Sequence, residues 1–321
     1  MRYLSINKLG PNSQLVILEQ EKPVCRAGEV LVQVKATAVN RADLMQRQGK
    51  YPPPAGESLT PGLEIAGNIV DCGKEVNKFK MGDSVYGLVA GGGYAEYCCL
   101  HQDLAAIIPP GWDYEYATAL PEALMTAQAT LFSLGKLAQK QTLLIHAAGS
   151  GISSLAIQMA KYSGAEVITT TSTKDKQIKG MALGATRVIN YQQEDFASVI
   201  YEQSIDLIVD FIGGSYFPKH MTLLKKQGKL VQIASMSGHH VDCDLIKLMQ
   251  KRIEIIGFVL RSQSLPEKAL LWHEAQKKWA EPLFNQAIKP IIDSLFGFTE
   301  VEKAHQRMQN GEHFGKIVIR L

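Results

Sequence analysis

The spacing of apolar residues divides the chain into two regions of different texture. Up to about residue 120, short apolar runs are separated by glycine and proline, which is typical of irregular β-structure. Residues 30–36 alternate apolar and polar positions as a half-buried strand does, and residues 64–70 and 83–89 repeat the pattern. The proline run within residues 51–56 predicts a loop, because consecutive prolines cannot donate ladder hydrogen bonds.

From residue 121 the pattern changes to strands that alternate with helices. Helices are predicted at 155–161 and 174–183, and Gly184 is a plausible stop for the second. Such alternation predicts an α/β region with a parallel, doubly wound (Rossmann) sheet. The tail, residues 260–321, is expected to form helices and a final strand at 315–319. The strands predicted for the sheet are 142–146, 166–170, 187–190, 205–211, 229–234 and 254–259.

Composition narrows the class of protein. A chain of 321 residues with 46% hydrophobic and 20% charged residues suits a soluble globular protein of two domains. The net charge of +3 is small, and the tightest basic pairs, Lys225-Lys226 and Lys277-Lys278, are expected on solvated helix faces. No nucleic-acid partner is therefore expected. No membrane partner is expected either, since no stretch approaches the ~18 consecutive apolar residues that span a bilayer.

Cysteine usage and the N-terminus indicate a compartment. The cysteines are odd in number and none has C-x-x-C spacing, which predicts neither a disulfide framework nor a zinc knuckle. The first residues lack the apolar run of a signal peptide. A reducing cytoplasm is the expected location. The five cysteines are Cys25, Cys72, Cys98, Cys99 and Cys243.

The turn after the first strand of the α/β region is a candidate dinucleotide site. Residues 146–154 read HAAGSGISS, and small residues there let helix N–H groups approach a pyrophosphate. Ala148, Ser150, Gly151 and Ile152 are the predicted contacts. The turn is not a literal G-x-G-x-x-G, because Ser154 stands at the last glycine position, so its position between a strand and a helix carries the prediction.

The end of the second strand of this region favours NADPH over NADH. An NAD site places a carboxylate there to bind the ribose hydroxyls, whereas residues 169–174 read TTTSTK and the first carboxylate is Asp175. Hydroxyls with Lys174 or Lys176 suit a 2′-phosphate, because an ammonium group neutralises its charge. The alternative is an ordinary helix cap followed by solvated lysines.

Several motifs in family order resemble the quinone oxidoreductase branch of the zinc-free medium-chain dehydrogenase/reductase superfamily. The segment 38–49 (AVNRADLMQRQG) precedes Tyr51 and the proline run, and GLEIAG follows at 62–67. Further matches are GDSV at 82–85, PEALMTA at 121–127, DFIGGSY at 210–216 and GKIV at 315–318. Within this branch the chain is most similar to stress-induced animal quinone oxidoreductases and, more distantly, to zeta-crystallin.

This resemblance implies a domain organisation and a set of site residues. A GroES-like β-rich catalytic domain would comprise residues 1–118 and 260–321, and an NADPH-binding domain residues 119–259. A homodimer joined through the edge strand at 254–260 is also implied. Asn40, Asp43 and Tyr51 would border the substrate, and Gly213 lies in a matched motif. The residues implied to hold the 2′-phosphate are Ser172, Lys176 and Tyr191, and those implied to line the nicotinamide end and the cleft are Thr126, Phe258, Leu260 and Lys316.

The chain departs from relatives of this superfamily at two kinds of position. Ser153 stands where the family turn has glycine, so a modest change in helix packing or pyrophosphate geometry is expected. Zinc alcohol dehydrogenases have a cysteine near Asn40 and a Gly-His-Glu motif near Leu63, with a four-cysteine lobe elsewhere, and this chain has none of these. We therefore expect no metal, since zinc needs three or four converging ligands.

Without a metal, the substrate must accept a hydride through its own conjugation, as a quinone or an α,β-unsaturated carbonyl does. The hypothesis is an NADPH:quinone oxidoreductase (EC 1.6.5 type) in which Tyr51 or Asn40 hydrogen-bonds the carbonyl oxygen. Asn40 could equally hold a turn, and Tyr51 could pack against the proline loop. For Asp43, a bond to Arg41, Arg47 or backbone is preferred to a proton relay. The alternative functions are an enone or enoyl double-bond reductase and a non-catalytic NADPH-binding protein.

Overall fold

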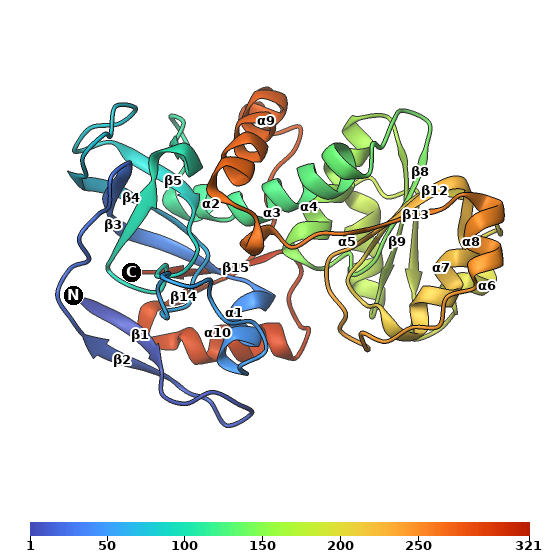
Figure 1. The fold of residues 1–321 in the computed structure, drawn as a ribbon, viewed down its shortest axis with the longest axis horizontal. Helices are drawn as coiled ribbons and strands as arrows, with labels where there is room; N and C mark the ends of the chain where they lie inside the picture. The colour runs from blue at the N-terminus through green and yellow to red at the C-terminus, as the bar shows by residue number, and fades with distance from the viewer. The chain divides into compact units, whose positions relative to one another are not determined.

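Two sheets of different construction organise the chain in the computed structural model, which describes residues 1–321 (Figure 1). One unit comprises Met1–Glu122, Arg261–Lys277 and Pro290–Leu321. The other comprises Ala123–Leu260 and Lys278–Lys289. The predicted ranges assign 278–289 to the catalytic domain, whereas here this segment packs in the second unit, where Trp279 Nε1 donates to Gln128 Oε1 at 2.8 Å. Those ranges, as functional domains, stay a prediction.

The first unit is built on a seven-stranded sheet that joins both ends of the chain. The sheet order is β14-β15-β3-β4-β5-β7, and β6 also pairs with β3. Apolar residues from the N-terminus, from β3 and from β15 form one core, which includes Leu4, Val39 and Ile317. The strands are β3 (Glu29–Val39), β4 (Glu64–Cys72), β5 (Ser84–Leu88), β6 (Tyr97–His101), β7 (Ala105–Ile107), β14 (Ile292–Gly297) and β15 (Lys316–Arg320), with a separate pair β1 (Arg2–Ile6) and β2 (Leu15–Glu19).

Short helices accompany this sheet. They are α1 (Arg41–Arg47), α2 (Tyr114–Thr118) and α10 (Val301–Gln309). The longer α9 (Leu265–Phe284) begins in the first unit and ends in the second. The predicted β-rich region and the final strand are confirmed, but the prediction for the tail omitted β14, whose sequence IDSLFG breaks the regular alternation of a half-buried strand.

The second unit is a six-stranded parallel sheet in the order β10-β9-β8-β11-β12-β13. Counted from β8, this is the 3-2-1-4-5-6 order of a dinucleotide-binding sheet, as the alternation predicted. The strands are β8 (Thr142–Ile145), β9 (Glu166–Thr171), β10 (Arg187–Asn190), β11 (Ile205–Asp210), β12 (Leu224–Gln232) and β13 (Glu254–Gly257). Its helices are α3 (Pro121–Ala127), the π-helical segment η2 (Gln128–Leu134), α4 (Gly151–Tyr162), α5 (Lys174–Ala182), α6 (Phe196–Val199), α7 (Phe217–Leu223) and α8 (Leu245–Lys251).

The starts of α4 and β12 differ most from the predicted boundaries. Helix α4 begins at Gly151, four residues before the predicted start, because the Ser150 side chain caps it. Strand β12 begins at Leu224, so Lys225 and Lys226 lie on a strand and their predicted placement on a helix face is wrong. Lys225 pairs with Asp206 at 2.6 Å, a contact that a short-range pattern cannot reveal.

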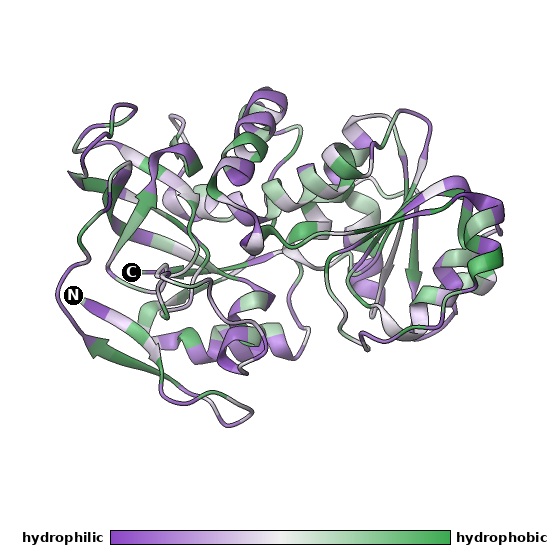
Figure 2. Ribbon diagram, in the orientation of Figure 1, coloured by the Kyte–Doolittle hydropathy of each residue, from purple (hydrophilic) through white to green (hydrophobic).

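Helix α8 exposes several large apolar side chains. Figure 2 shows polar residues along α10, whereas α8 carries several strongly apolar ones. Leu245, Ile246 and Met249 of α8 are each more than 60% exposed. No helix in the structure combines the length and the apolar character that a membrane crossing requires.

Candidate functional site

The turn between β8 and α4 has the geometry of an anion site. Ala147 adopts a φ of 57°, a left-handed conformation that makes the chain turn sharply after the strand. Ser150 Oγ then accepts the Ser153 N–H at 3.0 Å and starts the helix. The first N–H groups of a helix, here those of Gly151 and Ile152, have no partner within the helix and attract an anion. Ala148 is buried beneath the turn, where its N–H donates to the Thr170 carbonyl at 2.9 Å.

Ser153, at the position where the family has glycine, ties this turn together. Its side chain is fully buried, and its hydroxyl donates to the His146 carbonyl at 2.8 Å. The Ser150 hydroxyl lies 2.9 Å from Ser153 Oγ and donates to it. The serine therefore fixes the first turn of α4 against the end of β8, a bond that glycine could not make. How it changes the pyrophosphate geometry stays a prediction.

A buried hydrogen-bond chain underlies the same turn. His146 Nε2 lies 2.8 Å from His220 Nε2, and His146 Nδ1 lies 3.0 Å from Thr170 Oγ1. His220 Nδ1 lies 3.6 Å from Asp210 Oδ2, and all four side chains are almost completely buried. The chain joins the carboxyl ends of β8, β9 and β11, where the strand order reverses and where such sheets bind their ligands.

Both imidazoles in this chain are neutral. Burial lowers the pKa of His220 to about 4, although Asp210 opposes the shift. Burial, followed by the neighbouring His220, holds the pKa of His146 well below its usual value. The consistent assignment of protons has Thr170 donating to His146, His146 donating to His220, and the remaining His220 N–H directed at Asp210.

Asp210 connects the chain to the Gly213 loop. Its carboxylate accepts the N–H groups of Ile212 at 2.7 Å and Gly213 at 2.9 Å. Gly213 has a φ of 65°, and a Cβ there would lie 2.8 Å from the Gly238 carbonyl oxygen, so only glycine fits. Sequence reasoning did not identify His220 or Asp210 as a pair, because the 3.6-residue spacing of α7 does not show which strand it faces.

The residues predicted to hold a 2′-phosphate lie at the carboxyl ends of β9 and β10. Asn190 of β10 is in register with Thr171 of β9, and the Tyr191 N–H donates to the Thr171 carbonyl at 3.0 Å. Tyr191 and Ser172 therefore leave adjacent strands side by side. The Thr173 side chain caps α5 by accepting the Lys176 N–H, which places Lys176 in the first turn beside them.

The first carboxylate that follows β9 in the sequence pairs with a lysine. Asp175 is 70% exposed at its side chain and pairs with Lys179 at 2.8 Å, one turn along α5. The end of β9 itself carries hydroxyls and no carboxylate. A carboxylate at this position would accept the ribose hydroxyls of NADH and repel a 2′-phosphate, so its absence is the basis on which NADPH is predicted.

The other residues predicted for the second unit lie on separate segments. Thr126 is buried on α3, immediately before the π-helical segment η2. Phe258 follows β13, and its N–H donates to the Gln232 carbonyl at 3.0 Å. Leu260 is 8% exposed. Their roles at a nicotinamide ring stay predictions.

The first unit contains a buried ion pair built from three distant segments. Lys316 Nζ of β15 donates to Asn40 Oδ1 at 2.8 Å and to Glu64 Oε1 of β4. Asn40 Nδ2 donates to the same carboxylate at 2.8 Å, and the Glu122 N–H donates to its other oxygen at 3.0 Å. Lys316 and Glu64 are 3% and 0% exposed, so each charge depends on the other for compensation.

Asp43 begins a second buried chain in this unit. Its carboxylate accepts the N–H groups of Asn40 at 2.8 Å and Gly62 at 2.9 Å, and the Tyr94 hydroxyl at 3.2 Å. His305 Nε2 lies 3.0 Å from the Tyr94 oxygen, and Arg47 lies 3.3 Å from His305 Nδ1. Burial raises the pKa of Asp43 to about 6 despite these donors. Of the bonds expected for Asp43, the backbone bonds are present, and Arg47 is reached only through Tyr94 and His305.

Tyr51 lies beside a buried arginine that the sequence did not single out. The Arg261 guanidinium carbon is 5.4 Å from the Tyr51 ring centroid, and Arg261 donates to the Ala90 carbonyl at 2.7 and 3.0 Å. Burial raises the pKa of Tyr51 to about 12, while Arg261 opposes the shift. Tyr51 therefore keeps its proton at neutral pH. Arg261 follows the last strand of the parallel sheet without any motif that could have identified it.

Two groups of residues at the predicted site do not fit a zinc ion. Near Asn40 the Glu64 carboxylate already holds the Lys316 ammonium, which repels a further cation. His146, Asp210 and His220 are three potential ligands, but the two imidazoles bond each other directly and Asp210 approaches the opposite nitrogen of His220. The His146–His220 hydrogen bond occupies the Nε2 atom of each ring, whereas zinc needs three or four ligand atoms that point at it.

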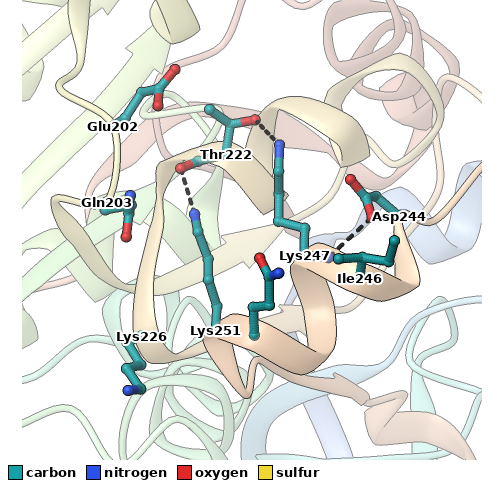
Figure 3. A pocket seen from close by; sticks show the side chains of 9 residues that line it. Glu202, Gln203, Thr222, Lys226, Asp244, Ile246, Lys247 and Lys251 are labelled. Carbon is teal, nitrogen blue, oxygen red and sulfur yellow. Dashed lines mark hydrogen bonds between the residues drawn. The ribbon is translucent and has the colours of Figure 1, made fainter.

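A pocket of about 390 Å³ lies at the opposite ends of the strands of the parallel sheet (Figure 3). It borders the start of β11 and β12, whereas the predicted site residues lie at the carboxyl ends. Lys251 donates to the carbonyls of Met221, Thr222 and Leu224, and Lys247 donates to Thr222 Oγ1 at 3.2 Å. These lysines cap the C-terminus of α7, so their role in the pocket is to stabilise the end of that helix.

The buried pair in the first unit predicts a specific pattern of stability. Lys316→Met or Glu64→Gln should each lower the free energy of unfolding by about 3 kcal/mol, because one buried group loses its partner. The double variant should recover much of this loss, since no charge then remains unpaired. Urea unfolding of the four proteins measures the coupling, and additive losses in the double variant would contradict it.

The histidine chain predicts a pH dependence of stability. Because the pKa of His220 falls from 6.5 in the unfolded chain to about 4 in the fold, its contribution is complete above pH 6.5 and is lost as the pH falls to about 4. Between these limits wild type should lose about 3 kcal/mol more than His220→Asn. Asp43, whose pKa is raised, gains stability over much of this window but is common to both proteins. Parallel pH profiles for the two proteins would count against a neutral buried His220.

Two family models and several known proteins match this chain. Residues 26–110 match the alcohol dehydrogenase GroES-like domain family, and residues 151–274 match the zinc-binding dehydrogenase family. The chain is 30% identical over 94% of its length to the synaptic vesicle membrane protein VAT-1 homolog of Danio rerio, of which it spans 66%. It is also 30% identical to prostaglandin reductase-3 of Bos taurus, over 100% of this chain and 89% of that protein.

Solved structures agree with these matches. The Escherichia coli quinone oxidoreductase complexed with NADPH superposes with a TM-score of 0.86 and 26% identity, over 100% of this chain and 99% of that one. The predicted fold, a GroES-like region with a Rossmann sheet, is confirmed. The chain has the NAD(P)-binding fold of these proteins, and it belongs to the quinone oxidoreductase/VAT-1 branch of the medium-chain dehydrogenase/reductase superfamily.

Proposed function

We propose that this member of an oxidoreductase family is a zinc-independent reductase that transfers a hydride from NADPH to quinones. The observation that carries the proposal is the end of β9, which carries hydroxyls and no carboxylate, with Ser172 and Lys176 following it and Tyr191 at the end of the adjacent strand. The quinone part draws support from the name of the E. coli structure. The Lys316 ammonium in the Asn40–Glu64 cluster supports chemistry without a metal.

When bound, NADPH supplies the hydride from its nicotinamide ring, and the residues of the chain bind and orient it. The N–H groups at the start of α4 hold the pyrophosphate, and Lys176 with Ser172 holds the 2′-phosphate. Reduction of a quinone to a hydroquinone consumes one hydride and one proton. Hydride transfer leaves negative charge on one oxygen of the quinone, and a donor must supply the proton that this oxygen takes up.

Tyr51 is the group that we assign to the substrate oxygen. Asn40 uses its amide oxygen for Lys316 and its amide N–H groups for Glu64 and Ala38. Asp43 accepts three hydrogen bonds within its own unit. Tyr51 remains protonated, and the nearby Arg261 charge favours loss of its proton as charge develops on the substrate.

The alternative substrate class is an enone or an enoyl thioester. The name of the bovine relative, a prostaglandin reductase at 30% identity, favours it. Quinones and enones accept a hydride by the same conjugation, so the same donor groups serve both. A chain that binds NADPH without turning over either class would instead be a non-catalytic binding protein.

We also propose that the chain forms a homodimer through the exposed edge of β13. Ile255 and Val259 are 44% and 40% exposed on this edge, and α8 adds Ile246 and Met249 at 63% and 64%. An unpaired strand edge with apolar neighbours favours pairing with a second copy. Sedimentation of the chain as a monomer at micromolar concentration would contradict this proposal.

The cofactor assignment predicts the outcome of a direct assay. With 1,2-naphthoquinone, NADPH oxidation followed by its own absorbance should exceed NADH oxidation. Lys176→Ala should raise the KM for NADPH roughly tenfold, the loss of about one charge-assisted contact, and leave the KM for NADH unchanged. Lys161→Ala, in the last turn of α4, is the matched control. Equal effects of Lys176→Ala on both cofactors would remove the 2′-phosphate assignment.

The assignment of Tyr51 predicts a change in kcat. Tyr51→Phe keeps the ring packed against Arg261 but removes the hydroxyl. Loss of a proton donor to the substrate should lower kcat about 10²-fold, with little change in the KM for NADPH. Tyr97→Phe, a tyrosine on β6, is the control. Unchanged turnover by Tyr51→Phe would leave the phenol with a packing role only.

A further inference from the structure

Two cysteines that are far apart in the sequence meet in the first unit. Cys25 precedes β3, Cys99 lies on β6, and their Sγ atoms are 2.8 Å apart. Both are free thiols of intermediate exposure, so small reagents reach them. The sequence predicted no disulfide framework, because it gives cysteine spacing along the chain but not across the sheet.

The surrounding backbone holds both thiols in place. Strand β6 pairs with β3, where Cys99 is in register with Leu31. The segment of Cys25 is fixed by the Arg26 N–H, which donates to Glu29 Oε2 at 2.8 Å, and by the Gly28 N–H, which donates to the Lys74 carbonyl at 2.7 Å. A disulfide needs a sulfur separation of about 2.05 Å, so a small shift of either side chain suffices.

The neighbouring cysteine is not the partner. Successive residues of a strand point to opposite faces, and Cys98 faces away from Cys99. Cys98 is 4% exposed, with its Sγ 3.7 Å from the Gly91 carbonyl oxygen, and burial is the largest cause that raises its pKa. Cys25 and Cys99 therefore form the reactive pair.

We propose that Cys25 and Cys99 are a dithiol site that low-molecular-weight disulfides, such as oxidised glutathione, convert reversibly into an intramolecular disulfide. The inference is independent of the proposed reductase activity. It assigns a modification site to the first unit, between the segment that precedes β3 and strand β6, which pairs with β3.

The chemistry proceeds by two thiol–disulfide exchanges. The hydrogen bond to Cys99, followed by burial, raises the pKa of Cys25, so the first exchange is assigned to the other sulfur of the pair. Cys99 attacks oxidised glutathione, forms a mixed disulfide and releases one glutathione thiolate. The Cys25 sulfur then attacks the Cys99 sulfur and gives up its proton as the second glutathione leaves. Two protein thiols lose two electrons and one small disulfide becomes two thiols.

The product constrains the first unit. The bond joins residues 74 positions apart, so it restricts the unfolded chain strongly. The oxidised form should melt several degrees higher than the reduced form, provided that the disulfide forms with little strain.

The test uses the full chain, reduced and then incubated with oxidised glutathione. We expect the loss of two alkylatable thiols per chain, a cross-linked peptide containing Cys25 and Cys99, a raised Tm, and reversal of all three by dithiothreitol. Cys25→Ser and Cys99→Ser should each abolish the cross-link and the Tm shift. Cys72→Ser, which removes a thiol of intermediate exposure from β4, and Cys98→Ser should retain both.

Other outcomes would overturn the proposal. These are five thiols that stay alkylatable, a cross-link that survives in Cys25→Ser, or a glutathione adduct on Cys99 that never resolves. Glu29 also lies within reach of both sulfurs. If the reduced chain, incubated with Zn²⁺ and dialysed, retained one equivalent through Cys25 and Cys99 and then resisted oxidation, the pair would be a metal site and not a disulfide site.

Discussion

The first unit depends on one buried charge, the ammonium of Lys316 near the end of the chain. Its partners, Asn40 and Glu64, are 276 and 252 positions away in the sequence. A buried ammonium is costly without compensation, so these bonds must form together with the sheet that carries them. Strand β15 pairs with β3, and β3 pairs with β4, which brings the three partners into one place. The same cluster explains why a second cation does not fit there.

The second unit solves a similar problem with neutral groups. Its buried chain runs by hydrogen bonds from Thr170 through His146 to His220, and Asp210 lies 3.6 Å from the far nitrogen of His220, where β8, β9 and β11 end. Neutral imidazoles cost less to bury than charged ones, and each can both donate and accept. The chain supports the backbone at Ala147 and Gly213, both of which have positive φ. Rigid support of this kind is what a turn that approaches a phosphate requires.

Charge also distinguishes the two predicted binding regions. The region of Ser172 and Lys176 contains hydroxyls and an ammonium, and the first carboxylate after β9, Asp175, pairs with Lys179. At Tyr51, the buried Arg261 lies close to a phenol that keeps its proton. The first arrangement favours an anionic group on the cofactor, and the second favours an oxygen that gains negative charge. Both fit a reductase that needs no metal to stabilise charge on its substrate.

The sequence alone determined the alternating strands and helices, the small-residue turn within 146–154 and the absence of a carboxylate at the end of β9, because each is a local pattern of apolar, small or charged residues. It also carried the motifs that identify the family. Only the tertiary structure decided that Ser153 bonds to the end of β8, that His220 meets His146 and that Cys25 meets Cys99. These contacts depend on how strands pair and which face a helix buries, and such long-range geometry leaves no periodic signal in the chain.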